Sequence, residues 1–120
     1  MKIFLRILAT IYAFAAFKHL ANILGFGELP WADAPLAWQI SDIAYAILDS
    51  VAAIGLYRQK RWGIAAFLLA AISEILLFTL VPDWFVLRPE HLLLLRGFVI
   101  YHFCAIGIWY WLSRRETHAG

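Results

Sequence analysis

The sequence predicts an all-α integral membrane protein, a four-helix bundle with both termini in the cytoplasm. Of the 120 residues, 64% are hydrophobic and only 15% are charged, and the mean hydropathy is +0.78. The core of one small soluble domain cannot bury that much apolar side chain. Apolar runs of membrane-spanning length and a one-sided distribution of Lys and Arg support the same fold class.

The four apolar runs cover residues 3–24, 36–57, 62–81 and 91–113. Each is close to the ~20 residues that a helix needs to cross ~30 Å of hydrocarbon. Glycine and proline interrupt the chain in the first and third breaks, and the run Arg58-Gln59-Lys60-Arg61 forms the second. We therefore expect residues 1–120 to form a single transmembrane domain, with no separate soluble domain.

Basic residues indicate the orientation of the bundle. They occur near the amino terminus, in the break at residues 58–61 and after the fourth run, whereas the first and third loops contain only Arg88. Because cytoplasmic loops carry the excess of Lys and Arg, we expect both termini in the cytoplasm of a multi-pass bacterial inner-membrane protein. A signal peptide ending near Ala15 is the alternative, but the first run continues to Leu24 and so predicts a retained span.

Polar and ionisable side chains occur within every predicted span. An ionised group at the bilayer centre costs ~2.5–3.5 kcal/mol on insertion scales, so such groups need partners inside the bundle. We expect these residues and the neighbouring Tyr45 to form a binding site or a charged intramembrane site. They are Lys18, His19, Asn22, Asp42, Tyr45, Asp49, Glu74, Arg96 and His102.

Helical phase predicts which faces carry these side chains. Asp42, Tyr45 and Asp49 follow i, i+3, i+7 spacing and therefore lie on one stripe of the second run. Glu74 lies on a stripe of small residues, which allow a neighbouring helix to approach closely. Glu74 is therefore expected to point into the bundle.

Depth in the membrane predicts which residues pair. Four charged residues lie five to seven positions from the outer ends of their runs: Lys18, Asp42, Glu74 and Arg96. We predict that Lys18 pairs with Asp42, and Glu74 with Arg96, because each pair joins consecutive helices at one depth. Asp49 and His102 lie nearer the middle of the membrane, where at least one of them should face the bundle interior.

Other chemistries have less support in the sequence. His19 and His102 could ligate a haem iron, but they differ in depth and no attachment motif accompanies them. A zinc site has no better support, so the sequence assigns no metal ligand, cofactor or catalytic residue. It contains no nucleophile elbow, phosphate loop or metalloprotease motif. The net charge of +2, without a basic recognition module, gives no reason to expect nucleic acid as a partner.

Three short motifs lie within residues 6–75: Phe17-Lys18-His19-Leu20, Leu36-Ala37-Trp38, and Ile54-Gly55-Leu56 before a basic turn. In these motifs the chain resembles the DoxX-like family of small four-helix bacterial membrane proteins. The chain has Ala15 where family members tend to have glycine, and Asp42 or Asp49 where they tend to have glutamate. The resemblance implies an accessory subunit of a membrane redox system or a role not yet determined. Only Lys18 and the acid of the second run correspond to residues of the family's motifs.

Three functions remain open. The first, which we favour, is an accessory or solute-binding component of a membrane system; the others are a small proton- or ion-coupled transporter and a membrane enzyme acting on a hydrophobic substrate. The buried charges could instead pair only to fix the order of the helices. The expected partners are the lipid bilayer and either a larger membrane complex or further copies of the chain.

Overall fold

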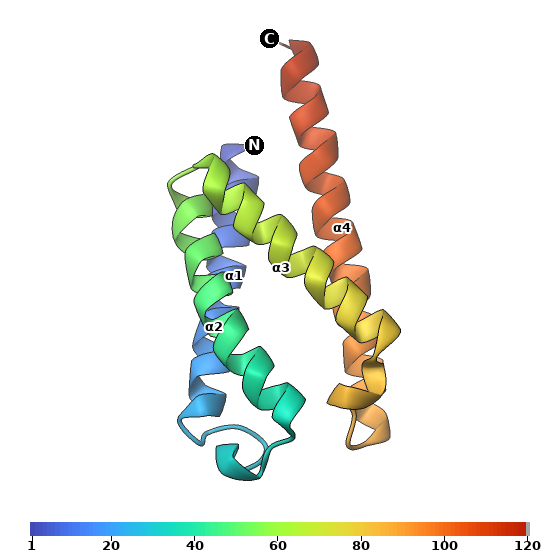
Figure 1. Cartoon of the computed structure of the whole chain (residues 1–120). Helices are drawn as coiled ribbons and strands as arrows, with labels where there is room; N and C mark the ends of the chain where they lie inside the picture. The colour runs from blue at the N-terminus through green and yellow to red at the C-terminus, as the bar shows by residue number, and fades with distance from the viewer. Residues whose placement is uncertain (120) are drawn as a thin grey trace.

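The described part of the chain folds into four long α-helices (Figure 1). The structure, a computed structural model, describes residues 1–119, with side chains described for residues 1–117. α1 spans Lys2–Ile23, α2 Leu36–Tyr57, α3 Arg61–Leu80 and α4 Pro89–Ala119, and two short 3-10 helices, η1 (Trp31–Asp33) and η2 (Pro82–Phe85), lie in the loops. All four α-helices are long and apolar enough to cross a membrane, which bears out the predicted helical class.

α4 extends beyond the predicted end at residue 113. Its last turns contain pairs of aromatic and basic residues spaced i, i+4, an arrangement that stabilises helices. The guanidinium of Arg114 donates to the Tyr110 hydroxyl at 3.3 Å, and that of Arg115 lies 4.7 Å from the centre of the Trp111 ring. The helix therefore continues past its apolar part.

Each helix packs mainly against the next one in the sequence, α1 on α2, α2 on α3 and α3 on α4. α3 runs diagonally between the α1–α2 pair and α4, and the two termini lie at the same end of the molecule (Figure 1). The bundle measures 52 × 25 × 17 Å. The end that carries the termini is called the terminal end below, and the end formed by the α1–α2 and α3–α4 loops is called the loop end.

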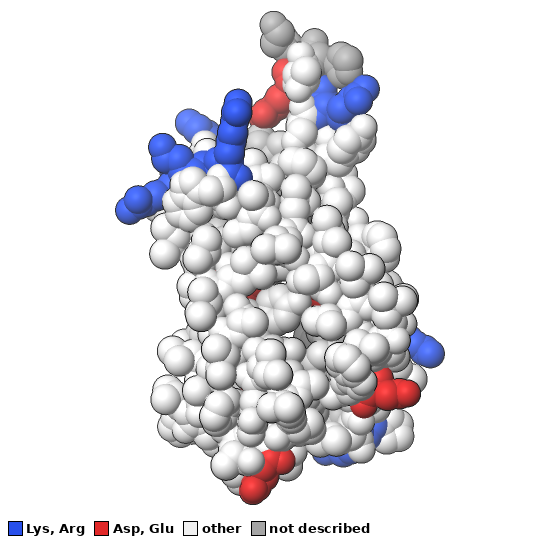
Figure 2. Space-filling view, viewed as in Figure 1, with Lys and Arg blue, Asp and Glu red and all other residues white. Residues whose placement is uncertain are grey.

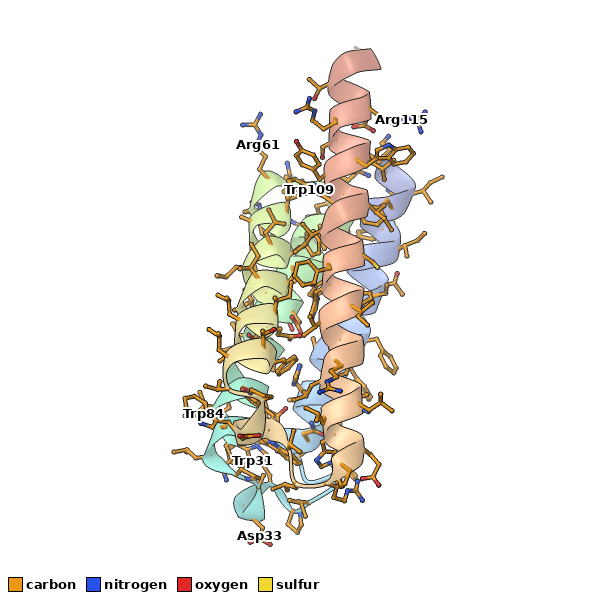
Figure 3. All side chains as sticks on the ribbon, turned by 90° about the vertical axis from the view of Figure 1, so that its right-hand side faces the viewer. Trp31, Asp33, Arg61, Trp84, Trp109 and Arg115 are labelled. Carbon is orange, nitrogen blue, oxygen red and sulfur yellow. The ribbon has the colours of Figure 1, made fainter. Side chains whose placement is uncertain are left out.

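The surface of the bundle is charged at its ends and apolar between them. Figure 2 shows Lys and Arg gathered at the terminal end of this face and a mostly uncharged middle. Large apolar side chains are exposed on every helix, among them Phe14, Ile47, Leu69 and Phe103. Figure 3 shows Arg61 and Arg115 at the terminal end and Asp33 at the loop end. Such a surface fits helices surrounded by lipid rather than water.

A pair of glycines allows the closest approach of two helices in the bundle. Gly55 and Gly63 face each other across the turn between α2 and α3, and a methyl group added to either would collide with backbone atoms of the other. The turn itself requires Gln59 to adopt a left-handed conformation, with φ of +58°. This crossing sets the angle at which α3 leaves α2.

A cluster of polar contacts ties the two loops together at the loop end. Glu28, in the α1–α2 loop, pairs with Arg88 and accepts a hydrogen bond of 3.0 Å from His91 Nε2. His91 Nδ1 accepts a hydrogen bond of 3.0 Å from the backbone N–H of Leu87, so the ring proton lies on Nε2. The buried His91 ring also meets Trp38 of α2 edge to face, 5.5 Å between centroids. These contacts hold the start of α4 against the α1–α2 hairpin.

Cys104 lies on the outside of the bundle. The sequence offers one cysteine within an apolar run, and the structure exposes it. The inward stripe of α4 is formed by residues three, four or seven positions apart, His91, Leu95, His102 and Ala105. Cys104, next to Ala105, is turned away from that stripe by about 100°.

The glycine crossing predicts that Gly63→Ala destabilises the protein, by about 1–3 kcal/mol, because the new methyl group meets backbone atoms that cannot move independently. Thermal unfolding in one detergent measures the effect. Gly107→Ala is the matched control, since a Cβ there meets no atom within 4 Å. Equal melting temperatures for the two variants would contradict the close crossing.

Candidate functional site

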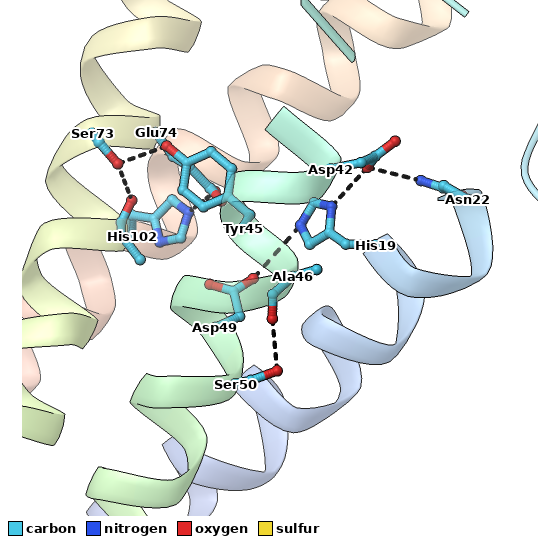
Figure 4. A network of polar contacts seen from close by, with 11 residues as sticks. His19, Asn22, Asp42, Tyr45, Ala46, Asp49, Ser50, Ser73, Glu74 and His102 are labelled. Atoms are coloured by element: carbon cyan, nitrogen blue, oxygen red, sulfur yellow. Dashed lines mark hydrogen bonds and ion pairs between the residues drawn. The ribbon is translucent and has the colours of Figure 1, made fainter. Parts of the chain in front are cut away.

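Polar side chains from all four α-helices meet inside the bundle (Figure 4). His19 comes from α1, Asp42 and Asp49 from α2, Glu74 from α3 and His102 from α4. The buried Ala52, Phe67 and Ala71 belong to the apolar core cluster that also includes Tyr45. These polar side chains, with Asn22, Tyr45 and Ser73, are called the central polar network below.

Asp42 fixes the orientation of the His19 ring. The two residues are joined by a hydrogen bond of 2.8 Å between His19 Nδ1 and Asp42 Oδ1, and the Asn22 amide donates to the same oxygen at 3.3 Å. An ionised carboxylate can only accept, so His19 Nδ1 carries a proton, and in the neutral ring Nε2 presents its lone pair. The His19 ring stacks on the Tyr45 ring, with 5.9 Å between the centroids, and this stacking restricts rotation of the imidazole.

The exposed lone pair of His19 faces a second carboxylate. His19 Nε2 lies 3.6 Å from Asp49 Oδ2, which is too long for a hydrogen bond. Asp49 is only 2% exposed, and its Oδ1 has no hydrogen-bond partner among the described residues. When His19 is neutral and Asp49 is ionised, two acceptors face each other in a buried place, and this arrangement requires a proton or a cation between them.

On the other side of the site, Glu74 and His102 form a pair. Glu74 Oε2 and His102 Nε2 are 2.6 Å apart, and His102 is 5% exposed. Nearby, the Tyr45 hydroxyl donates to Ser73 Oγ at 2.6 Å, because the Ser73 hydroxyl itself donates to the Ala70 carbonyl at 3.0 Å. These contacts join α3 to both α2 and α4.

Three potential ligand atoms converge between these pairs. His19, Asp49 and Glu74 each offer one nitrogen or oxygen atom, and all three atoms lie within 4.8 Å of one another. Buried polar atoms without a partner among the described residues also include His102 Nδ1 and the hydroxyl groups of Tyr12 and Tyr101. The centre of the bundle therefore offers more hydrogen-bonding and ligating capacity than its own residues use.

An open cavity of about 160 Å³, a groove rather than an enclosed space, borders the central polar network. At ~30 Å³ for each molecule of liquid water, the cavity has room for about five waters or one small solute. Phe85 of η2 and Leu95 of α4 line it, so it extends from the network toward the loop end. Its polar lining is His19, Asn22, Ser41, Asp42, Tyr45 and Glu74, and its remaining lining is Trp38, Phe78, Phe85 and Leu95.

Two of the residues predicted for the site lie outside it. Lys18 and Arg96 are exposed on the outer faces of α1 and α4, and neither forms an ion pair with any residue that the structure describes. The predicted Lys18–Asp42 and Glu74–Arg96 pairs are therefore wrong. In their place the structure shows His19–Asp42 and His102–Glu74 contacts.

Helical phase explains both corrections. The inward stripe of α1 includes Tyr12 and Ala16, and His19 lies two turns after Tyr12 on that stripe, whereas Lys18 is rotated away by about 100°. Long basic side chains can place their charge near the end of a span, where water is close, while a histidine cannot. Lys18 and Arg96 thus tolerate an outward position.

The other predicted residues lie in the network. They are His19, Asn22, Asp42, Tyr45, Asp49, Glu74 and His102. Asp49 and His102 both face the bundle interior, as predicted for at least one of them. Ser73, Tyr12 and Tyr101 were not among the residues predicted for the site. The two-turn spacing between Tyr12 and His19, which places them on the same face of α1, is the sequence feature that could have predicted Tyr12 as a site residue.

The fold and the site together define a small helical protein with four candidate membrane spans and a buried polar centre, within the described residues. The chain belongs to a family of unknown function, DUF6163, whose family model matches residues 1–114. No curated protein and no solved structure matches the chain. The match covers every residue of the central polar network, and the family description names no activity.

The Glu74–His102 pair predicts a strongly non-additive double-mutant cycle. His102→Phe alone should cost about 3–5 kcal/mol, because it leaves a buried carboxylate without its partner, whereas His102→Phe with Glu74→Met should cost much less. Thermal unfolding in detergent with a chelator present gives the stabilities of wild type, the two single variants and the double variant. Arg96→Met is the control and should change stability by less than about 0.5 kcal/mol. Costs that simply add across the cycle would contradict the pair.

Proposed function

We propose that the chain is a multi-pass protein of the bacterial inner membrane that binds a small polar or charged ligand inside its bundle. In this role it serves as an accessory or solute-binding component of a membrane system, within a larger complex or as a homo-oligomer. The observation that carries the proposal is the cavity beside the central polar network, lined by His19, Asp42 and Glu74. A ligand in this cavity would meet groups that can accept hydrogen bonds, donate hydrogen bonds and carry charge.

Burial supports a binding role over a purely structural one. A network that only held the helices together would satisfy its own atoms, because an unpaired polar group in an apolar interior costs about 1–3 kcal/mol. Asp49 Oδ1 and His102 Nδ1 have no such partner among the described residues. Neither residue lines the cavity itself, but each contacts a residue that does, Asp49 through His19 and His102 through Glu74.

The charge distribution supports an orientation with both termini in the cytoplasm. Arg61 and Arg115 lie at the terminal end together with the rest of the basic residues outside the spans, except Arg88 (Figure 3). Trp109 lies toward that end, and Trp31 and Trp84 lie toward the other (Figure 3). Basic residues favour the cytoplasmic side, and tryptophans favour the two headgroup regions. The cavity would then open toward the outer side of the membrane.

A proton- or ion-coupled transporter is the second candidate. The specific observation in its favour is the series of ionisable groups that runs from Asp42 through His19 and Asp49 to Glu74 and His102, from the cavity to the middle of the bundle. Such series carry protons or ions in membrane proteins. The resemblance to DoxX-like proteins stays a prediction and agrees with the accessory role.

The proposed topology predicts the outcome of reporter fusions. Reporters placed after Gly120 and within the turn at Gln59 should report a cytoplasmic location, and one placed at Asp33 should report an external one, because the basic residues retain the terminal end in the cytoplasm. An external signal from the carboxyl terminus would contradict the topology. Fusions that lack one span provide the control for reporter activity on either side.

The binding role predicts that the protein, extracted in a mild detergent with its lipids, retains a non-lipid ligand in native mass spectrometry. Asp42→Asn should reduce the retained fraction by at least tenfold, because it removes both the charge and the orientation of His19. Lys18→Gln is the matched control, since this exposed residue on the same helix as His19 lies outside the network. Identical mass spectra for wild type and Asp42→Asn would contradict the proposal.

A further inference from the structure

We infer that the ligand of the central polar network is a divalent transition-metal ion of the Zn²⁺, Mn²⁺ and Fe²⁺ class, held by His19, Asp49 and Glu74. The inference rests on the proposed function, because it names the chemical class of the ligand at the same site. Sequence analysis assigned no metal, since the three residues belong to three different helices and share no spacing motif. The fold brings them together.

The distances suit a shared ion. His19 Nε2 and Asp49 Oδ2 are 3.6 Å apart, and the three ligand atoms lie within 4.8 Å of one another. Two ligands that each lie ~2.1 Å from an ion, at a tetrahedral angle, are about 3.4 Å apart. Small side-chain rotations therefore suffice to bring all three atoms into coordination.

Neighbouring residues orient the ligands in the way that metal sites require. Metal-binding histidines usually donate their other ring N–H to a carboxylate, which fixes the tautomer and the plane of the ring. His19 does this with Asp42 at 2.8 Å, so that Nε2 is left free to ligate. His102 holds Glu74 in the same manner at 2.6 Å. Asp42 and His102 are thus positioning residues.

Electrostatics favours a divalent ion over a proton at this place. Asp49 is 2% exposed, and its Oδ1 lacks a partner among the described residues. One proton can neutralise one carboxylate and bridge one gap between acceptors. An ion of charge +2 neutralises both Asp49 and Glu74 and satisfies three acceptor atoms at once.

The donor set indicates the class of metal. One imidazole nitrogen and two carboxylates suit borderline ions such as Zn²⁺, Mn²⁺ and Fe²⁺, whereas Cu⁺ prefers sulfur and Ca²⁺ prefers oxygen ligands alone. Cys104 is exposed on the outer face of α4 and supplies no thiolate here. Three protein ligands leave a coordination position open. Because His19 and Glu74 also line the cavity, a water or solute can reach the ion.

Metal binding can be measured directly on the full-length protein in detergent. The protein is stripped with EDTA, exposed separately to Zn²⁺ and Mn²⁺, freed of excess ion and analysed for metal by mass spectrometry. We expect about one ion per wild-type chain and a higher melting temperature with metal than without it. Asp49→Asn and Glu74→Gln should each weaken the apparent affinity at least tenfold. Asp83→Asn, an exposed acid in η2, is the matched control and should bind as wild type does.

A positioning variant tests the assignment of roles. Asp42→Asn should keep one ion per chain but bind it 10–100-fold more weakly, the usual effect of removing the hydrogen-bond partner of a ligand. If Asp49→Asn and Glu74→Gln fail to fold, X-ray absorption spectroscopy of the Zn²⁺-loaded wild-type protein tests the ligand assignment instead. It should show imidazole scattering together with oxygen ligands, and a shell without imidazole would overturn the inference.

The outcomes separate this inference from the proposed function. Folded wild type that retains no Zn²⁺ or Mn²⁺, or retains as much after Asp49→Asn, overturns the metal assignment. If an organic ligand is then retained by wild type and lost in Asp42→Asn, the proposed function stands without the metal. If neither metal nor any other ligand is retained, both are overturned.

Discussion

Hydrocarbon offers no hydrogen-bond partner, so each ionisable side chain inside a span must find its partners within the bundle or reach water at the ends. Two contacts meet this constraint here, His19 with Asp42 and His102 with Glu74. Each joins different helices, and together with the Tyr45–Ser73 hydrogen bond they connect α1 to α4 through α2 and α3. Helix order and rotation therefore depend on where the polar side chains can meet.

The packing of the helices explains why the central polar network has hydrogen-bonding and ligating capacity that its own residues do not use. Small residues bring α2 and α3 close at the Gly55–Gly63 crossing, and α3 then diverges toward α4 (Figure 1). The space left on the loop side becomes the cavity, and Asp42 of α2 and Glu74 of α3 border it. Asp49 lies where the helices still pack tightly, yet one of its oxygen atoms lacks a partner among the described residues. The ligand that we propose would reconcile the burial of Asp49 with a charge on its carboxylate.

Hydrophobic length and breaks predicted the four helices and most of their bounds, because a span must have a minimum length and glycine, proline or charge must interrupt it. Helical phase correctly placed Asp42 and Asp49 on one inward stripe of α2, and the cost of a charge in hydrocarbon correctly predicted an inward position for at least one of Asp49 and His102. The assignment of ion pairs was wrong because it used depth and chain order, and neither of these determines how a helix is rotated about its axis. Lys18 and His19 are adjacent in sequence but face in different directions, and only the packing of Tyr12 and Ala16 decides which one is inside. The convergence of His19, Asp49 and Glu74 depends on three helix rotations at once and could not be read from spacing.

Polar groups of all four helices converge on one buried site, which we propose binds a ligand. An experimental density map of the wild-type protein in a lipid nanodisc tests this proposal most directly. We expect non-protein density among His19, Asp49 and Glu74, within coordinating distance of all three, with Lys18 and Arg96 turned outward. A map in which His19 or Glu74 faces lipid, or in which the three side chains enclose no such density, would contradict it.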